Sequence, residues 1–402
     1  MINSKKNKLF LAGGVFPFPK SSGGATRFYH TIKNLSKYFD IYLLLFKPSY
    51  YRLSPADTRF LKKHTRYYEI IVTTDHQSQD SFFSTTKPYW FSPWYHPDAL
   101  LATRRIIFQN KIKFAQIDTT QIAYLIDSIP RTVFSIFVAY DICTTSFIRR
   151  LAEVKNLKTY IVHYIRYLEI YFYEQKYLKL FNKIVVMSPV DRKEVRRLFG
   201  VTNSISVPNG IESINFLNKS VDPSPLKIGL LGSFSHPPNR FAFSYFLENI
   251  APLLNRQKIN FNLYLVGNNS TPEIQSIVNN IYPQIYSKIH NLGFIKSTKS
   301  VFKGFDCLFA PIFSGSGTRV KIIEALSFGI PVITSPIGAE GIKTSNPFLT
   351  VAHTPQEYVN ATKKLASINV PSNLIKLKTF LKPFLWSSIF DKYYQQVHHH
   401  FK

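Results

Sequence analysis

Residues 315–335, with the sequence GSGTRVKIIEALSFGIPVITS, decide the fold that we expect for this chain. They follow the apolar run 307–311 and combine a glycine-rich turn, a helix and a short apolar strand that begins at Pro331. Glycine lets backbone N–H groups come close to an anion, and the positive end of a helix dipole strengthens that attraction. The stretch therefore predicts a strand–turn–helix–strand unit whose turn binds an anion.

The polar side chains of this helix suit a nucleotide diphosphate. Thr318 can cap the helix and donate to a phosphate, and Arg319 and Lys321 add full positive charges. Glu324 lies one turn after Lys321 on the same helix face, where its carboxylate can accept two hydrogen bonds from the hydroxyls of a ribose. An ordinary strand-to-helix turn is the alternative interpretation. The residues after Glu324 favour a helix that packs closely on a sheet: Ala325, Gly329 and Pro331.

Short apolar runs alternate with longer amphipathic stretches along the rest of the chain. This alternation is typical of βα units and parallel sheets. The expected strands are residues 8–13, 41–46, 69–72, 114–117, 133–138, 183–187, 204–207, 227–231, 261–266, 289–292, 307–310, 331–334 and 349–351. The expected helices include 25–38, 98–110, 147–181, 239–254, 298–303, 318–328 and 355–366.

A chain of 402 residues is long enough for two domains. Residues 211–225, rich in serine and proline, fit a linker. We therefore expect an α/β protein with two Rossmann-like, doubly wound domains that face each other across a cleft. Residues 1–212 would form the first domain and residues 213–384 the second. Ligands bind outside the carboxyl ends of the strands in such sheets.

The composition is strongly basic. Fifty Lys and Arg against 23 Asp and Glu give a formal net charge of +27, which attracts nucleic acid, anionic lipid or phosphorylated substrates. A compositional bias of the genome is the alternative. Two cysteines, Cys143 and Cys307, build no disulfide framework and have no second cysteine at metal-ligand spacing. We find no apolar stretch near the ~18–20 residues of a membrane-spanning helix.

The pattern GSGTR-x-K-x-x-E-A-x-x-x-G-x-P-V resembles the donor site of the group 1 (family 4) retaining glycosyltransferases of GT-B fold, in their Gly-Ser-Gly-Thr-Arg subgroup. Further segments resemble the family in the same order along nearly the whole chain. They are SGGATRFYHTIKNL at 22–35, KIVVMSPVDRKEV at 183–195, VPNGIES at 207–213, LLGSFSHPPNRFAFSYF at 230–246 and FLWSSIFDKYYQQV at 384–397.

The resemblance implies that residues 1–212 form an acceptor-side domain, completed by a C-terminal helix at about 385–402, and that residues 213–384 bind the donor. It also implies both donor-binding and catalytic residues. Arg319, Lys321 and Glu324 would act on the donor, and Asp141, at the end of a strand, would contact the acceptor hydroxyl or the transferring sugar. A helix-capping role is the alternative for Asp141. The implied donor-binding residues are Gly23, Gly24, Gly232, Ser233, Asn239, Gly315, Ser316, Gly317, Thr318, Gly338, Ala339, Glu340 and Gly341.

Two departures from the family pattern limit this transfer of roles. Many relatives carry two glutamates in the donor motif, and Ser316 occupies the position of the first one, so its role does not carry over. Many members also place an Arg and a Lys on the diphosphate from the start of the donor domain. Residues 233–240 have no obvious counterpart, and we expect Arg319 and Lys321 to substitute.

The resemblance implies transfer of a sugar, with retention, from a nucleotide-diphosphate sugar to a glycan or lipid-linked acceptor in cell-surface polysaccharide or glycolipid synthesis. No cofactor is expected, and the sequence has no Asp-x-Asp metal pair. The protein would be cytoplasmic and peripheral on an anionic membrane, with a solvated helical face as the alternative. The basic and aromatic residues concerned are Arg149, Arg150, Lys155, Lys158, Tyr160, Tyr164, Arg166, Tyr167 and Tyr171.

Two other functions compete with this interpretation. A GT-B-fold nucleotide-sugar epimerase would need no acceptor, but we find no catalytic carboxylate and histidine set for it. A nonenzymatic basic protein that binds nucleotides or RNA would explain the charge. RNA-binding motifs are missing, so no nucleic acid partner is expected.

Overall fold

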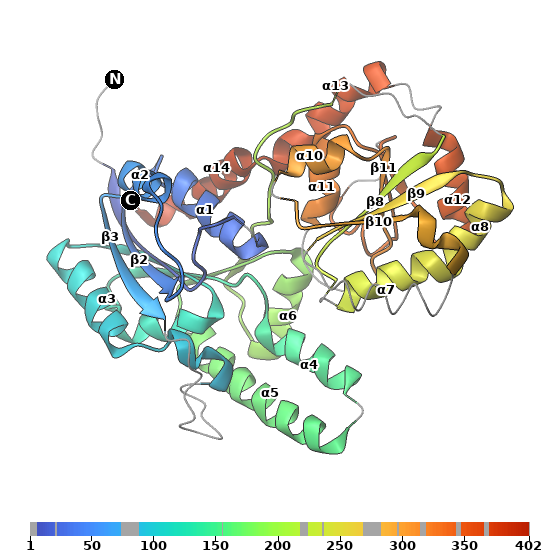
Figure 1. The fold of residues 1–402 in the computed structure, drawn as a ribbon. Helices are drawn as coiled ribbons and strands as arrows, with labels where there is room; N and C mark the ends of the chain where they lie inside the picture. Colours follow the sequence, from blue (N-terminus) through green and yellow to red (C-terminus); the bar gives the residue numbers. More distant parts are fainter. Residues whose placement is uncertain are drawn as a thin grey trace. The chain divides into compact units, whose positions relative to one another are not determined.

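The computed structural model describes residues 6–20, 22–73, 88–154, 156–217, 224–234, 237–267, 283–295, 297–313, 319–342, 347–365 and 370–401. The chain folds as two compact units (Figure 1). Unit 1 contains Met1–Pro208 together with Ile389–Lys402, and unit 2 contains Asn209–Ser388. The sequence predicts these two divisions at 212/213 and 384/385.

Unit 1 is built on a seven-stranded parallel sheet with the order β3-β2-β1-β4-β5-β6-β7. The register pairs Leu11 of β1 with Leu43 of β2 on one side and with Gln116 of β4 on the other. The middle of β1 and of β2 is a continuous buried apolar run because helices cover both faces of the sheet. The strands are β1 (Asn7–Gly13), β2 (Phe39–Pro48), β3 (Tyr67–Thr73), β4 (Phe114–Asp118), β5 (Phe134–Val138), β6 (Lys183–Val186) and β7 (Ser204–Ser206).

The helices of unit 1 follow the strands as crossover connections. They are α1 (Gly23–Leu35), α2 (Pro55–His64), α3 (Pro97–Gln109), α4 (Cys143–Glu153), α5 (Leu157–Leu178) and α6 (Pro189–Phe199), with 3₁₀ segments at Tyr89–Trp94 and Thr120–Ser128. The expected helical stretch 147–181 thus contains two helices. The chain turns extended at Val154, and the Asn156 side chain then caps α5 by accepting from the Thr159 N–H at 3.1 Å.

Residues 389–401 follow unit 2 in the sequence but belong to unit 1. They belong to α14 (Trp386–Val397) and the 3₁₀ turn His398–Phe401. The Tyr394 ring stacks on Tyr38 with the centroids 4.1 Å apart, and the Tyr38 hydroxyl donates to Asp391. The buried Tyr393 hydroxyl donates to Gln116 Oε1 of β4 at 2.8 Å. This helix is therefore tied to unit 1 by polar contacts, one of them buried, as well as by apolar packing.

Unit 2 repeats the design with a six-stranded parallel sheet of order β10-β9-β8-β11-β12-β13. The strands are β8 (Leu226–Leu231), β9 (Phe261–Val266), β10 (Ile289–Gly293), β11 (Cys307–Ala310), β12 (Val332–Thr334) and β13 (Leu349–Val351). The helices include α7 (Pro237–Tyr245), a π turn (Phe246–Ile250), α8 (Ala251–Arg256), α10 (Thr298–Lys303), α11 (Val320–Ser327), α12 (Pro355–Lys364) and α13 (Val370–Leu381). Both units thus have the doubly wound strand order of Rossmann-like domains, which confirms the predicted fold class.

Candidate functional site

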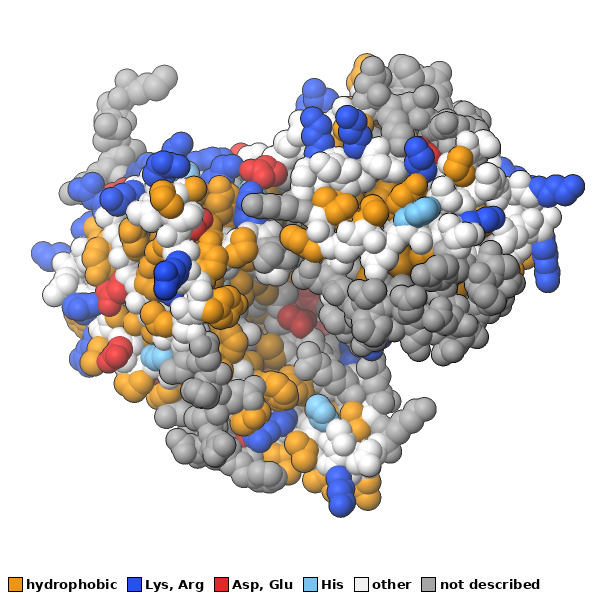
Figure 2. All heavy atoms as spheres, viewed as in Figure 1, with side chains coloured by type: hydrophobic (Ala, Val, Ile, Leu, Met, Phe, Trp, Pro, Cys, Tyr) orange, Lys and Arg blue, Asp and Glu red, His pale blue; other side chains and the backbone are white. Residues whose placement is uncertain are grey.

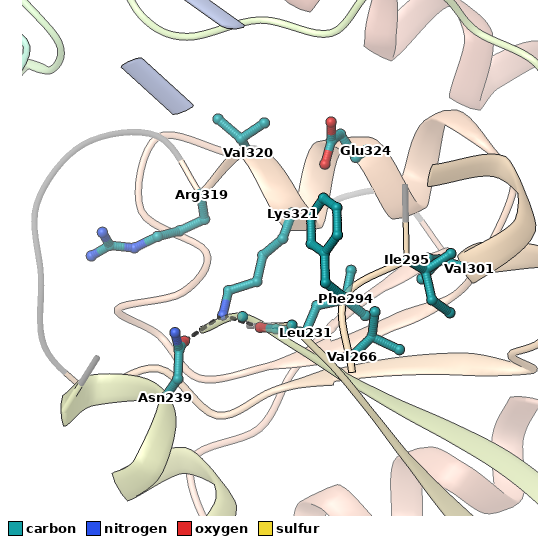
Figure 3. Close-up of a pocket in the computed structure, with 12 residues that line it drawn as sticks. Leu231, Asn239, Val266, Phe294, Ile295, Val301, Arg319, Val320, Lys321 and Glu324 are labelled. Atoms are coloured by element: carbon teal, nitrogen blue, oxygen red, sulfur yellow. Dashed lines mark hydrogen bonds between the residues drawn. The ribbon is translucent and has the colours of Figure 1, made fainter. Parts of the chain in front are cut away.

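A cavity of about 450 Å³ lies in unit 2 at the carboxyl ends of β8 and β9 (Figure 3). The strand order changes direction between β8 and β11, so the connections that leave these two strands run to opposite sides and open a crevice. The start of α11 forms one wall of it. The cavity is lined by Leu231, Gly232, Asn239, Val266, Gly267, Phe294, Ile295, Val301, Arg319, Val320, Lys321 and Glu324.

The Lys321 ammonium is held at the end of β8. Its Nζ donates to the Leu231 carbonyl at 2.8 Å and to Asn239 Oδ1 at 3.0 Å. The Asn239 Nδ2 in turn donates to the Ser233 carbonyl at 2.8 Å, which fixes the orientation of the amide. Burial, with a smaller contribution from the positive charge of Arg319, lowers the pKa of Lys321 to about 8. The site therefore holds a partly desolvated cation at a defined position.

Glycines let the backbone come close to this cation. Gly232 has φ = +145°, and a Cβ atom at this position would lie 2.4 Å from Asn239 Nδ2. A Cβ atom on Gly267 would lie 2.0 Å from the Gly232 carbonyl oxygen. Real Cβ atoms do not approach other atoms so closely, so both positions require glycine. The turn after β8 is thereby shaped around Asn239 and, through it, around Lys321.

Glu324 provides the negative group of the site. It lies three residues after Lys321 on α11, is partly buried and lines the same cavity (Figure 3). Within the described ranges, its carboxylate has no hydrogen-bond or ion-pair partner. Burial raises the pKa of Glu324 to about 7. A carboxylate in this state is ready to accept hydrogen bonds from the hydroxyl groups of a ligand.

The opposite wall is apolar. Phe294, which follows β10, is 56% exposed although it lines the cavity, and Val266, Ile295 and Val301 lie beside it (Figure 3). An exposed aromatic ring offers a flat surface on which a planar group can stack. The cavity thus suits a ligand that combines an anionic part, vicinal hydroxyls and a flat ring.

The structure brings five predicted site residues together in this cavity: Gly232, Asn239, Arg319, Lys321 and Glu324. Ser233 contributes its carbonyl group as the acceptor for Asn239. Four further predicted residues, Gly315, Ser316, Gly317 and Thr318, lie outside the described residues.

The predicted cap of the helix, Thr318, lies outside the described residues, and the N-cap position itself falls one residue later. Helix α11 begins at Val320, and its N-cap position is Arg319, which makes no side-chain capping bond. Arg319 has φ = −77° and ψ = 79°, so the backbone is not yet helical at this point. Arg319 still lines the cavity (Figure 3), and its positive charge lies close enough to Lys321 to contribute to the lowered pKa of that ammonium.

The predicted loop 338–341 does not line this cavity. Gly338 and Ala339 are buried in the turn after β12, and the Gly338 N–H donates to Ser335 Oγ at 3.2 Å. Glu340 and Gly341 are exposed. These residues keep their role in donor binding only as a prediction.

The predicted residues of unit 1 lie at two helix starts. Gly23 and Gly24 are the first residues of α1, which Ser22 caps by accepting from the Ala25 N–H at 3.2 Å. Asp141 is exposed and accepts from the Ser146 hydroxyl. The alternative capping role of Asp141 is wrong, since Ile142 is the N-cap of α4.

Sequence reasoning missed the N-terminal anchor of α4. The buried Glu174 carboxylate, from α5, accepts from the Cys143 N–H at 3.0 Å and from the Thr144 N–H at 2.9 Å. Burial raises the pKa of Glu174 to about 7, although these hydrogen bonds oppose the shift. The spacing along the chain gives no signal for such a contact.

Sequence reasoning also missed a buried carboxyl group in unit 1. Asp118, at the end of β4, accepts from Gln116 Nε2 at 2.7 Å and from the Tyr140 hydroxyl at 2.8 Å. Burial raises the pKa of Asp118 to about 6. Asp118 directly follows the predicted strand 114–117, next to the switch point between β1 and β4, so the switch-point rule could have identified it. Phe294 follows the edge strand β10, away from the switch point between β8 and β11, so this rule gives no signal for it.

The described residues include neither a metal-binding cluster nor a membrane-spanning helix. In the described part of the chain, no three or more His, Cys, Asp and Glu residues lie close enough to bind a metal ion together. None of its helices is both long and apolar enough to span a bilayer.

Comparisons with known proteins agree with this geometry. Residues 225–367 match the family model described as "Glycosyl transferases group 1". No curated protein sequence matches the chain.

Solved structures match the chain over nearly its whole length. Sucrose-phosphate synthase from Thermosynechococcus elongatus has a TM-score of 0.66 at 14% identity, over 98% of this chain and 99% of that one. A glycosyltransferase from Rickettsia africae ESF-5 has 0.64 at 10% identity, over 99% of both chains. Anabaena HepE in complex with UDP-glucose has 0.60 at 14% identity, over 97% of this chain and 99% of that one. The chain therefore has the GT-B fold of two Rossmann-like domains, and its second unit matches the group 1 glycosyltransferases.

Proposed function

We propose that this protein is a retaining glycosyltransferase that takes its sugar from a nucleotide-diphosphate donor. One observation carries the proposal: the Lys321 ammonium and the Glu324 carboxylate lie one turn apart on α11 and line the same cavity, and no described residue pairs with that carboxylate. An ammonium for phosphate and a carboxylate for ribose hydroxyls, at this separation, match the layout of a nucleoside diphosphate. The family match of residues 225–367 supports the same conclusion.

In this proposal each part of the donor has its own contact in unit 2. The diphosphate lies against Lys321, the ribose hydroxyls donate to Glu324, and the base stacks on Phe294. Structural relatives support this class of donor, since HepE was solved with UDP-glucose and a trehalose-6-phosphate protein from E. coli with UDP-2-fluoro glucose. A donor screen identifies the base and the sugar that this chain prefers.

The proposed chemistry follows from the charges. The bond between the anomeric carbon and the phosphate oxygen breaks, and negative charge collects on the departing diphosphate. Lys321 and Arg319 stabilise that charge, and the loss of one such contact costs about 10²–10³ in rate. The acceptor oxygen bonds to the anomeric carbon on the face that the diphosphate leaves, and the acceptor proton passes to the leaving phosphate. The configuration is thereby retained without an enzyme nucleophile.

We further propose a glycan or lipid-linked acceptor in cell-surface polysaccharide or glycolipid synthesis, without a cofactor or a metal ion. The absence of an Asp-x-Asp pair in the sequence supports metal independence. The net charge of +27 supports a peripheral position on the cytoplasmic face of an anionic membrane. Asp141 remains the proposed contact of the acceptor in unit 1.

The donor screen tests the proposal. Release of nucleoside diphosphate is measured for a panel of uridine, guanosine and adenosine diphosphate sugars, with wild type beside Glu324→Ala. We expect one donor to be used and the variant to lose at least about 100-fold in kcat/KM. Glu248→Ala, at an exposed glutamate of the same unit, is the matched control and should behave as wild type.

Two outcomes contradict the proposal. Equal activity of wild type and Glu324→Ala would show that Glu324 does not bind the donor. Conversion of the donor sugar without any acceptor would identify an epimerase instead.

A further inference from the structure

The first turns of α5 project from the body of unit 1. Residues 156–162 are all exposed, whereas the helix is increasingly buried from Arg166 onward. Large apolar side chains occupy this projecting end: Leu157 is 73% exposed, Ile161 51% and Tyr164 44%. Figure 2 shows hydrophobic and basic side chains at this end of α5. Contiguous apolar surface of this kind marks an interaction site.

These side chains form one stripe. Leu157, Ile161 and Tyr164 are spaced by four and three residues, and Tyr160 lies beside them with its ring stacked on Tyr164 at 6.3 Å. Side chains at this spacing share one helix face. Tyrosine rings present an apolar body and a polar hydroxyl tip, which suits a boundary between apolar and aqueous phases. We call Leu157, Tyr160, Ile161 and Tyr164 the α5 stripe.

The charged residues in the segment that carries the stripe have one sign. Lys158 is exposed next to Leu157, and residues 156–168 contain no Asp or Glu. An anionic surface therefore meets no acidic residue of this segment, and the net charge of +27 adds a long-range attraction.

Some of the residues that the sequence predicted to contact the membrane are buried in the structure. Arg166 is buried, donates to Glu169 Oε1 at 2.8 Å and lies over the Tyr89 ring at 4.2 Å, so it cannot contact lipid. Tyr167 and Tyr171 pack against the core of unit 1. The side chains of Arg150 and Lys155 lie outside the described residues.

We propose that the α5 stripe inserts into the head-group layer of an anionic bilayer and that Lys158 binds the lipid phosphates. This inference rests on the proposed function, which it deepens by naming the surface that meets the membrane. Amphipathic helices with aromatic and aliphatic side chains on one face and basic side chains beside them bind in this way, with the apolar face ~5–10 Å deep.

Vesicle flotation of the full chain tests the inference. Phosphatidylglycerol-containing vesicles are compared with pure phosphatidylcholine vesicles at low salt. We expect binding only to the anionic vesicles. The double variant Leu157→Ser/Ile161→Ser should lower the partition coefficient about 100-fold, since each buried aliphatic side chain contributes about tenfold. Lys158→Glu should also weaken binding, and more so at low salt than at high salt.

A matched control and a second readout separate this inference from the proposed function. Leu101→Ser, at a leucine of α3 that is 68% exposed, should leave flotation unchanged. Binding of nucleoside diphosphates in solution should be the same in the double variant and in wild type, because the stripe lies in unit 1. Three results overturn the inference: no flotation of wild type at low salt, equal flotation of the double variant, or a wild-type dimer in solution that the double variant abolishes. The last result would assign the stripe to a second copy of the chain.

Discussion

Replacing Gly232 by alanine tests whether the backbone turn after β8 holds the Lys321 ammonium in place. The new methyl group would lie 2.4 Å from Asn239 Nδ2 and 2.6 Å from Asn239 Cγ, so the amide must move. Its movement breaks two hydrogen bonds, one from Lys321 Nζ and one to the Ser233 carbonyl. We expect Gly232→Ala to destabilise the turn after β8 and to release Lys321 at the same time.

The magnitude follows from these contacts. The positive φ of Gly232 costs about 1–3 kcal/mol with a side chain, and each lost hydrogen bond costs about 1 kcal/mol. We therefore expect a loss of about 3–5 kcal/mol in local stability. Gly293→Ala is the matched control, because Gly293 also has positive φ, at 61°, but a Cβ atom there would meet no atom of the described residues within 4 Å. It should cost only about 1–2 kcal/mol.

Hydrogen exchange of the full chain, resolved for the peptides of β8 and α11, measures these local free energies. A double-mutant cycle with Asn239→Ala isolates the clash: in that background Gly232→Ala should cost only the backbone strain, which leaves a coupling energy of about 2 kcal/mol. Binding of nucleoside diphosphate should fall about tenfold in Gly232→Ala. Additive effects of the two substitutions would refute the reasoning, as would an unchanged exchange rate in Gly232→Ala.

Three further predictions concern buried carboxyl groups and the cation. Glu324 ionises at about pH 7 and Lys321 loses its proton at about pH 8, so the affinity for a nucleotide sugar, measured by calorimetry, should be highest between these two pH values. Glu324→Gln should remove the loss of affinity on the acidic side of the optimum, and Lys321→Arg should remove the loss on the alkaline side. The raised pKa means that the ionised Glu324 costs folding energy above about pH 7 and none below pH 4.5. Glu324→Gln should therefore raise the free energy of unfolding by about 1–3 kcal/mol at pH 8 and leave it nearly unchanged at pH 4, by urea denaturation. Glu174→Gln should lower the local stability of α4 by about 2 kcal/mol, because the glutamine NH₂ group would face the N–H group of Cys143 or of Thr144. Hydrogen exchange of the α4 amides measures this change. Exchange rates equal to those of wild type would contradict the prediction.

The sequence predicted the strands well because each is a short apolar run bounded by polar residues. Every expected strand corresponds to a strand of the structure, within about two residues at each end. Helix boundaries were less accurate where a cap comes from far away in the sequence. The start of α4 depends on Glu174, about thirty residues later, and no local pattern announces that contact.

The candidate site was predictable where one helix carries it. Lys321 and Glu324 share a helix face by their spacing alone, so their proximity followed from the sequence. The contact between Lys321 and Asn239 did not follow from the sequence. Asn239 is 82 residues away along the chain, and only the strand order of unit 2 brings the two side chains together. Arg166 was misassigned to the surface for the same reason: its cover, Tyr89, comes from a separate 3₁₀ segment.

The return of residues 389–401 to unit 1 has a consequence for biosynthesis. The ribosome makes all of unit 2 after the first 208 residues and before this helix. Until then, Gln116 lacks the Tyr393 hydroxyl, and Tyr38 has neither Asp391 nor the Tyr394 ring. The half of the protein that emerges first is therefore the last to become complete, and a nascent chain stalled before residue 389 should expose an apolar seam to chaperones and proteases.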